Sequence, residues 1–200
     1  MDFKSTSMIE LAVVVAQHLK QKDIQVVLVG GLAVEIYTEN QYLTNDIDMV
    51  DISYQKPAVL RAAMLELGFT KQGRVYRNSS TDIVVEFPSA PLAVGDELIK
   101  EQTNIETEFG EIPILFAVDV IKDRLAAYLH WKDQQSLIQA LCIMLCHKIA
   151  PKEIKAFYEN EGSKVAFEEL QSMHSTLKTK NLYEMPDIEK YVVEQLLEAL

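Results

Sequence analysis

Apolar residues recur with two different periods along the chain, and the change between them divides it into two parts. Before residue 117, short β-branched runs alternate with amphipathic helical segments, a pattern typical of a mixed α/β sheet core flanked by helices. After residue 117 only the helical period continues, and it predicts helices over 118–128, 134–148, 152–160, 164–177 and 187–200. We therefore expect an α/β (α+β) domain over 1–117 and a helical bundle over 118–200. No Pro/Gly-rich spacer separates them, so we expect them to pack together.

The first part of the chain alternates between predicted helices and strands. The pattern predicts helices over 7–20, 32–37 and 56–67 and strands over 24–29, 45–52, 69–74, 75–78 and 82–87. Ser5 or Ser7 can cap the first helix, and Pro57 suits the first turn of the third. The segment 97–106 is ambiguous. The segment 110–115 contains Pro113 and predicts a short edge strand, because proline cannot donate to a sheet ladder.

A glycine pair, Gly30 and Gly31, follows the strand predicted at 24–29 and precedes a predicted helix. Glycine lets backbone N–H groups approach a ligand closely, and the N-terminus of a helix favours an anion. This order of strand, glycine pair and helix predicts a phosphate-binding turn.

Three carboxylates follow at positions that suggest a metal site. Asp46 and Asp48 are two residues apart on a predicted strand, so they share one face, where they repel each other unless a divalent cation lies between them. Glu86 ends an otherwise apolar strand, a costly position for a charge without a compensating cation. Asp82 shares its face but lies about 13 Å earlier along the strand, which makes it a weaker candidate. We predict that Asp46, Asp48 and Glu86 bind catalytic Mg²⁺.

The charge and composition of the chain limit the kinds of binding partner and the location that we expect. The chain has 19 basic and 30 acidic residues and a net charge of -11, which disfavours broad nonspecific DNA binding. No secretory signal and no membrane-spanning run is apparent, so a cytoplasmic protein without a membrane partner is expected. Cys142 and Cys146 could share a metal with a nearby histidine, but two buried reduced thiols are the more ordinary use of cysteine inside a cell.

The residues Val29-Gly30-Gly31-Leu32-Ala33 and Thr44-Asn45-Asp46-Ile47-Asp48 resemble the glycine and Thr-x-Asp-Ile-Asp motifs of the nucleotidyltransferase superfamily. The chain is most similar to small bacterial members of this fold, including toxin-like members of type IV toxin-antitoxin systems. The resemblance covers about 24–87. It departs from the usual pattern in two places, because Gly31 stands where many members have serine and Glu86 where aspartate is commoner.

The resemblance implies a role for each matching residue. Gly30 and Gly31 would hold the nucleotide phosphates with Thr44 beside them, Asp46 and Asp48 would bind magnesium, and Glu86 would complete the triad or deprotonate the acceptor. Two further residues, Lys122 and Arg124, belong to the helical part. They could contact the triphosphate, as a basic residue does in related proteins, or form ordinary surface ion pairs, with Asp119 as a partner for Lys122.

We therefore expect a magnesium-dependent nucleotidyltransferase that transfers an NMP group from an NTP, such as ATP, to a hydroxyl acceptor of unknown identity. The acceptor could be a protein side chain, a tRNA end or a small molecule such as an aminoglycoside. The alternative is a non-catalytic module of the same fold that binds a nucleotide or a protein partner, for instance as part of a toxin-antitoxin pair.

Overall fold

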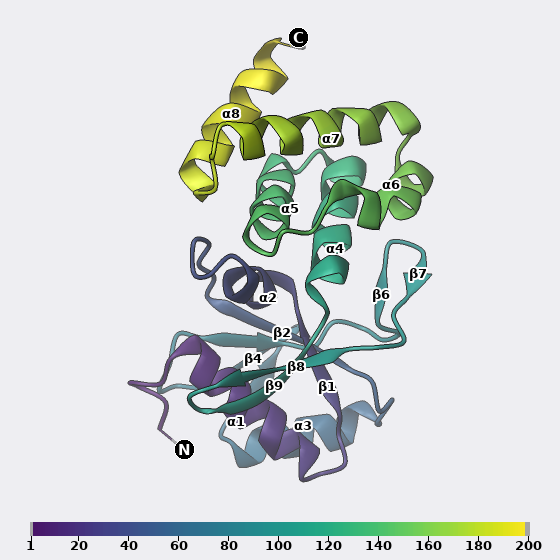
Figure 1. Cartoon of the computed structure of the whole chain (residues 1–200). Helices are drawn as coiled ribbons and strands as arrows, with labels where there is room; N and C mark the ends of the chain where they lie inside the picture. The colour runs from purple at the N-terminus through teal and green to yellow at the C-terminus, as the bar shows by residue number, and fades with distance from the viewer. Residues whose placement is uncertain (1, 199–200) are drawn as a thin grey trace. The chain divides into compact units, whose positions relative to one another are not determined.

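The computed structural model describes residues 2–198, and its largest feature is a seven-stranded mixed sheet (Figure 1). The strands lie in the order β3-β4-β5-β2-β1-β9-β8. Their bounds are β1 (Val26–Val29), β2 (Asp46–Asp51), β3 (Thr70–Gln72), β4 (Val75–Arg77), β5 (Val84–Glu86), β8 (Thr103–Thr107) and β9 (Gly110–Ile114). The β2/β5 and β1/β9 pairs are parallel and the others antiparallel. A separate two-stranded sheet joins β6 (Ala93–Val94) and β7 (Glu97–Leu98).

The rest of the chain is mainly helical. Along the sequence, α1 (Met8–Lys20) comes before the first strand, and α2 (Gly30–Tyr37) and α3 (Pro57–Glu66) lie between strands. The remaining helices are α4 (Ala117–Trp131), α5 (Gln134–Cys146), the 3₁₀ helix η1 (Pro151–Ile154), α6 (Lys155–Glu161), α7 (Lys164–Thr179) and α8 (Met185–Glu198). Figure 1 shows α1 and α3 side by side against one face of the sheet. The predicted fold class, a mixed sheet flanked by helices and followed by C-terminal helices, is confirmed.

The predicted edge strand at 110–115 is wrong in one respect, because β9 lies inside the sheet between β1 and β8. The ambiguous segment before it contains β8, which pairs with β9 along the full length of β9. Pairing of β9 with β1 is limited to Leu28 opposite Ile114, directly after Pro113. Proline has no N–H to donate, so a strand that contains it pairs fully on one side only.

The chain forms two compact units. The first comprises Met1–Ala33, Leu43–Ala93 and Glu97–Phe116, and the second comprises Val34–Tyr42, Val94–Asp96 and Ala117–Leu200. We expected a single boundary near residue 117. In the structure, the segments 34–42 and 94–96 also belong to the unit that contains the C-terminal helices. In the second unit, α5 is buried on all sides along residues 136–145, as expected for a helix at the centre of a bundle.

Among residues 2–198, no helix combines the length and the apolar character that crossing a bilayer requires.

Candidate functional site

Gly30 lies where β1 meets α2, and its backbone adopts the left-handed conformation, with φ at +63°. The antiparallel register of β1 and β2 pairs Val29 with Asp48, so the Asp48 side chain lies beside the residue that follows Val29. A Cβ atom added to Gly30 would overlap the Asp48 carboxylate and lie 3.0 Å from both Cβ and Cγ of Asp48. Position 30 therefore requires glycine twice, for the backbone angle and for the neighbouring aspartate.

Gly31 approaches Thr44 in a similar way. A Cβ atom added to Gly31 would lie 2.8 Å from Thr44 Oγ1 and 3.1 Å from Thr44 Cβ. The same hydroxyl accepts a hydrogen bond from the backbone N–H of Asp46 at 3.3 Å, a local turn that threonine commonly makes. Thr44 thus contacts both the first turn of α2 and the start of β2.

Asp46, Asp48 and Glu86 share one face of the sheet. Alternate residues of a strand point to the same side, which places Asp46 with Asp48 on β2. The parallel register of β2 and β5 sets Asp48 opposite Glu86, on strands about 4.8 Å apart. Ile47 and Met49 point to the opposite face, where both are fully buried. Asp46 is exposed and Asp48 and Glu86 are half-buried, so this face is open to a polar ligand.

Glu86 has a partner that the sequence did not reveal. Its Oε1 lies 3.7 Å from Nε of Arg74, which is 90% exposed. The antiparallel pairing of β4 with β5 sets Val75 opposite Glu86, and the preceding Arg74 is therefore within reach. An exposed ion pair of this kind contributes at most about 1 kcal/mol, so Glu86 can exchange Arg74 for another partner at little cost.

The donor chemistry of this face fits magnesium. Among residues 2–198, no three His, Cys, Asp or Glu side chains come close enough together to hold a metal ion. Mg²⁺ is commonly held by one or two carboxylates together with phosphate oxygens and water, and the pair Asp46 and Asp48 offers carboxylates of this kind. That these two residues and Glu86 bind the metal together stays a prediction.

Lys122 and Arg124 lie on α4 in the second unit, where each has a partner. Lys122 Nζ is 3.6 Å from Oδ1 of the buried Asp119 and 5.4 Å from the centre of the Phe157 ring. Arg124 Nε donates to Oδ2 of Asp123 at 2.9 Å. The partner expected for Lys122 is therefore present, although the pair is largely enclosed and not at the surface. The contact of both residues with a triphosphate stays a prediction.

Cys142 and Cys146, the two residues weighed as thiols or metal ligands, lie one turn apart on α5. Both are free thiols with their Sγ atoms 4.0 Å apart, and Cys142 is buried. Burial, with the neighbouring Cys146 adding to it, raises the pKa of the Cys142 thiol. A raised pKa keeps this thiol protonated and unreactive, as expected of a structural cysteine.

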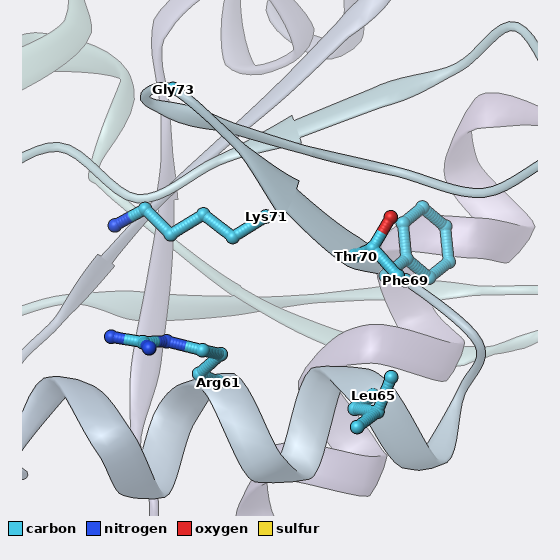
Figure 2. A pocket seen from close by; sticks show the side chains of 6 residues that line it. All are labelled: Arg61, Leu65, Phe69, Thr70, Lys71 and Gly73. Atoms are coloured by element: carbon cyan, nitrogen blue, oxygen red, sulfur yellow. The ribbon is translucent and has the colours of Figure 1, made fainter.

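The hollow in Figure 2 lies at the edge of the sheet and away from the carboxylate face. Figure 2 shows the side chains of Arg61 and Lys71 extending in the same direction from α3 and β3. Lys71 pairs with Tyr76, which in turn pairs with Val85, so all three share the face opposite to Glu86. This hollow of about 450 Å³ is therefore not the predicted phosphate site. Its lining consists of Arg61, Leu65, Phe69, Thr70, Lys71 and Gly73.

No protein-family model matches the chain, and no curated protein matches it. Among solved structures, it is similar to the solution structure of the antibiotic-resistance factor ANT(2'')-Ia, an aminoglycoside nucleotidyltransferase. The superposition has a TM-score of 0.51 and 15% sequence identity, and it covers 83% of this chain and 97% of the other. This likeness shows that the chain shares the fold of that structure, a mixed sheet with flanking helices and C-terminal helices.

Proposed function

We propose that this chain is a magnesium-dependent nucleotidyltransferase that transfers an NMP group from an NTP to a hydroxyl acceptor. The observation that carries the proposal is the contact of Gly30 with Asp48 at the start of α2, on the sheet face that also bears Asp46 and Glu86. The first N–H groups of a helix have no partner within the helix and attract an anion. A phosphate and the cation that neutralises it therefore have binding groups in the same place.

Each residue of this face has a defined task in the proposal. The N–H groups of Gly30 and Gly31 bind the phosphates, which only residues without a Cβ atom allow so close to Asp48 and Thr44. Thr44 fixes the start of β2 by accepting the hydrogen bond from Asp46. Asp46 and Asp48 hold magnesium, which when bound neutralises phosphate charge and makes the acceptor oxygen a better nucleophile.

The transfer itself is a displacement at the α-phosphorus. The acceptor oxygen forms a bond to this phosphorus, the bond to the bridging oxygen of the β-phosphate breaks, and pyrophosphate leaves. Glu86 accepts the proton of the acceptor hydroxyl after it separates from Arg74, an exposed and weak partner. The net charge of -11 favours a small molecule or a protein side chain over a long nucleic acid as the acceptor.

Calorimetric titration of the four NTPs with Mg²⁺ tests the nucleotide site. We expect one or more NTPs to bind the native protein and to bind an Asp46→Asn/Asp48→Asn variant at least about tenfold more weakly, a loss of about 1.4 kcal/mol. Asparagine keeps the shape of each side chain, so the packing of Asp48 on Gly30 is retained. Asp82→Asn is the matched control, because Asp82 is exposed and outside the proposed site. Failure of the folded native protein to bind any NTP would reject the proposal.

The second candidate is a module of this fold that binds a nucleotide or a protein partner without catalysis, as in a toxin-antitoxin pair. The spacing of the carboxylates favours it, because among residues 2–198 no three His, Cys, Asp or Glu side chains come close enough together to hold a metal ion. Pyrophosphate release in the presence of a panel of amino sugars, nucleosides and hydroxyl-bearing peptides separates the two candidates. An enzyme releases pyrophosphate with some acceptor and loses this activity in Glu86→Gln while NTP binding persists, whereas a binding module releases none.

A further inference from the structure

The second unit contains a cavity that has no part in the proposed transfer. It has a volume of about 210 Å³, roughly the space of seven water molecules at about 30 Å³ each. Met144 and Leu145 at the end of α5 form an apolar part of its wall, and its polar lining comes from α7 and the adjoining loops. The complete lining consists of Met144, Leu145, Lys148, Ala150, His174, Lys178 and Tyr183.

His174 on α7 is the most unusual residue of this lining. It is only 8% exposed, yet its ring makes no hydrogen bond within residues 2–198. In that part of the chain, the only fully enclosed side-chain polar atom without a partner is Oε1 of Gln139, so the ring nitrogens of His174, a lining residue of the cavity, are accessible to water or to a ligand. A ligand in the cavity can therefore form a hydrogen bond with this ring in place of water.

Lys148 and Lys178 bring positive charge to the same cavity. Lys178 follows His174 by one helical turn, so the two residues share a face of α7. Within residues 2–198, neither lysine side chain forms an ion pair or a hydrogen bond, although the chain has 30 acidic residues for 19 basic ones. Two lysines without a carboxylate partner beside a buried histidine make an electrostatic environment that favours an anion.

We propose that this cavity binds a small oxyanion, a phosphate- or carboxylate-bearing molecule whose apolar part lies against Met144 and Leu145. Lys148 and Lys178 neutralise its charge, and an N–H of His174 donates a hydrogen bond to one of its oxygens. The site is distinct from the proposed nucleotide site, since all of its residues belong to the second unit. If this cavity binds no anion, the proposed nucleotidyl transfer is therefore not affected.

Titration of the full-length protein with inorganic phosphate and with propionate, followed by NMR of the histidine side chains, tests the proposal. We expect a saturable change of the His174 resonances with one or both anions below about 10 mM, ten times a weak dissociation constant of about 1 mM. A response to phosphate alone assigns the site to phosphoryl groups, and a response to propionate alone assigns it to carboxylates. No saturable response of His174 to either anion would overturn the proposal.

A charge-removing variant tests whether the two lysines are responsible. Lys148 has a left-handed backbone, with φ at +55°, which asparagine tolerates well, so Lys148→Asn/Lys178→Gln should fold normally. We expect this variant to bind the responding anion at least about tenfold more weakly. Lys152→Gln/Lys164→Gln removes the same charge from the same unit outside the cavity and should bind like the native protein. If both variants bind the anion more weakly to the same extent, the effect comes from the net charge of the protein and the site is rejected.

Discussion

Two glycines with almost the same backbone angle allow the role of the Asp48 contact to be measured. Gly30 and Gly73 have φ values of +63° and +64°, but a Cβ on Gly30 would meet Asp48 whereas one on Gly73 would meet nothing within 4 Å. We expect Gly73→Ala to lower the free energy of unfolding by about 1 kcal/mol, the cost of a left-handed alanine. Gly30→Ala should cost about 1–3 kcal/mol more, because it also forces the aspartate to move. Urea denaturation measures both, and equal losses would contradict the close contact.

The burial of His174 has a consequence for stability in acid. Burial, with a smaller effect from Lys178, lowers the pKa of this imidazole below its ordinary value of 6.5. The unfolded chain therefore takes up the proton more readily, so the stabilising contribution is complete above about pH 6.5 and is lost as the pH falls through the lowered pKa. The other titratable groups that line its cavity are Lys148, Lys178 and Tyr183. We expect His174→Gln to lose less stability than the native protein between pH 7 and 5 in urea denaturation without added anions, and parallel losses would contradict this.

Among single residues, the sequence identified the candidate site residues that break the apolar pattern of their own strand. The pair Gly30-Gly31 ends an apolar strand and Asp46 and Asp48 interrupt another, so both were visible without coordinates. Arg74 was not, because its contact with Glu86 depends on the register of two short strands joined through a loop. A one-residue change of register would reverse the face of every side chain in a strand, and strands of three residues carry too little hydrophobic pattern to reveal the register in advance.

Among the elements, α6 is held at its end by one buried carboxylate. Glu161, whose side chain is 6% exposed, accepts a hydrogen bond from the backbone N–H of Asp96 at 3.3 Å and lies 2.7 Å from Nε2 of His130. We expect Glu161→Ala to cost about 1–3 kcal/mol, because both partners lose an acceptor. Amide exchange at Asp96 should accelerate in the same variant. Glu159→Ala, which removes only the more exposed pair with Lys155, should cost less than about 0.5 kcal/mol and leave Asp96 protected.

The elements themselves were predictable where local chemistry determines them. Ser7 caps α1 by accepting a hydrogen bond from the N–H of Glu10, and Pro57 begins α3, as the sequence indicated. β8 was ambiguous because none of its residues is buried and its exposure alternates only between half-buried and exposed, so its pairing with β9 defines it better than its composition does. The helix expected over 152–160 divides into η1 and α6, a difference in hydrogen-bond pattern that apolar spacing does not reveal.

For the molecule as a whole, the net charge of -11 predicts a response to salt. We expect the melting temperature to rise between 10 and 150 mM NaCl, because screening weakens the repulsion among carboxylates. MgCl₂ at equal ionic strength should stabilise the native protein further, by about 1.4 kcal/mol at ten times the dissociation constant. The Asp46→Asn/Asp48→Asn variant should respond alike to both salts in a thermal melt. An equal response of the native protein to both salts would argue against a specific magnesium site.

The contact between Gly30 and Asp48 also limits which substitutions related chains can accept at position 30. A lineage that lost the chemistry but kept Asp48 would still need glycine at position 30, because any larger residue would collide with the aspartate. Retention of this glycine in a related chain would thus report inherited architecture and not activity. Asp46 carries the opposite information, since its exposed side chain is free to drift once nothing selects for it. Among related chains, replacement of the aspartate at position 46 would therefore be the first sign that the proposed activity has been lost.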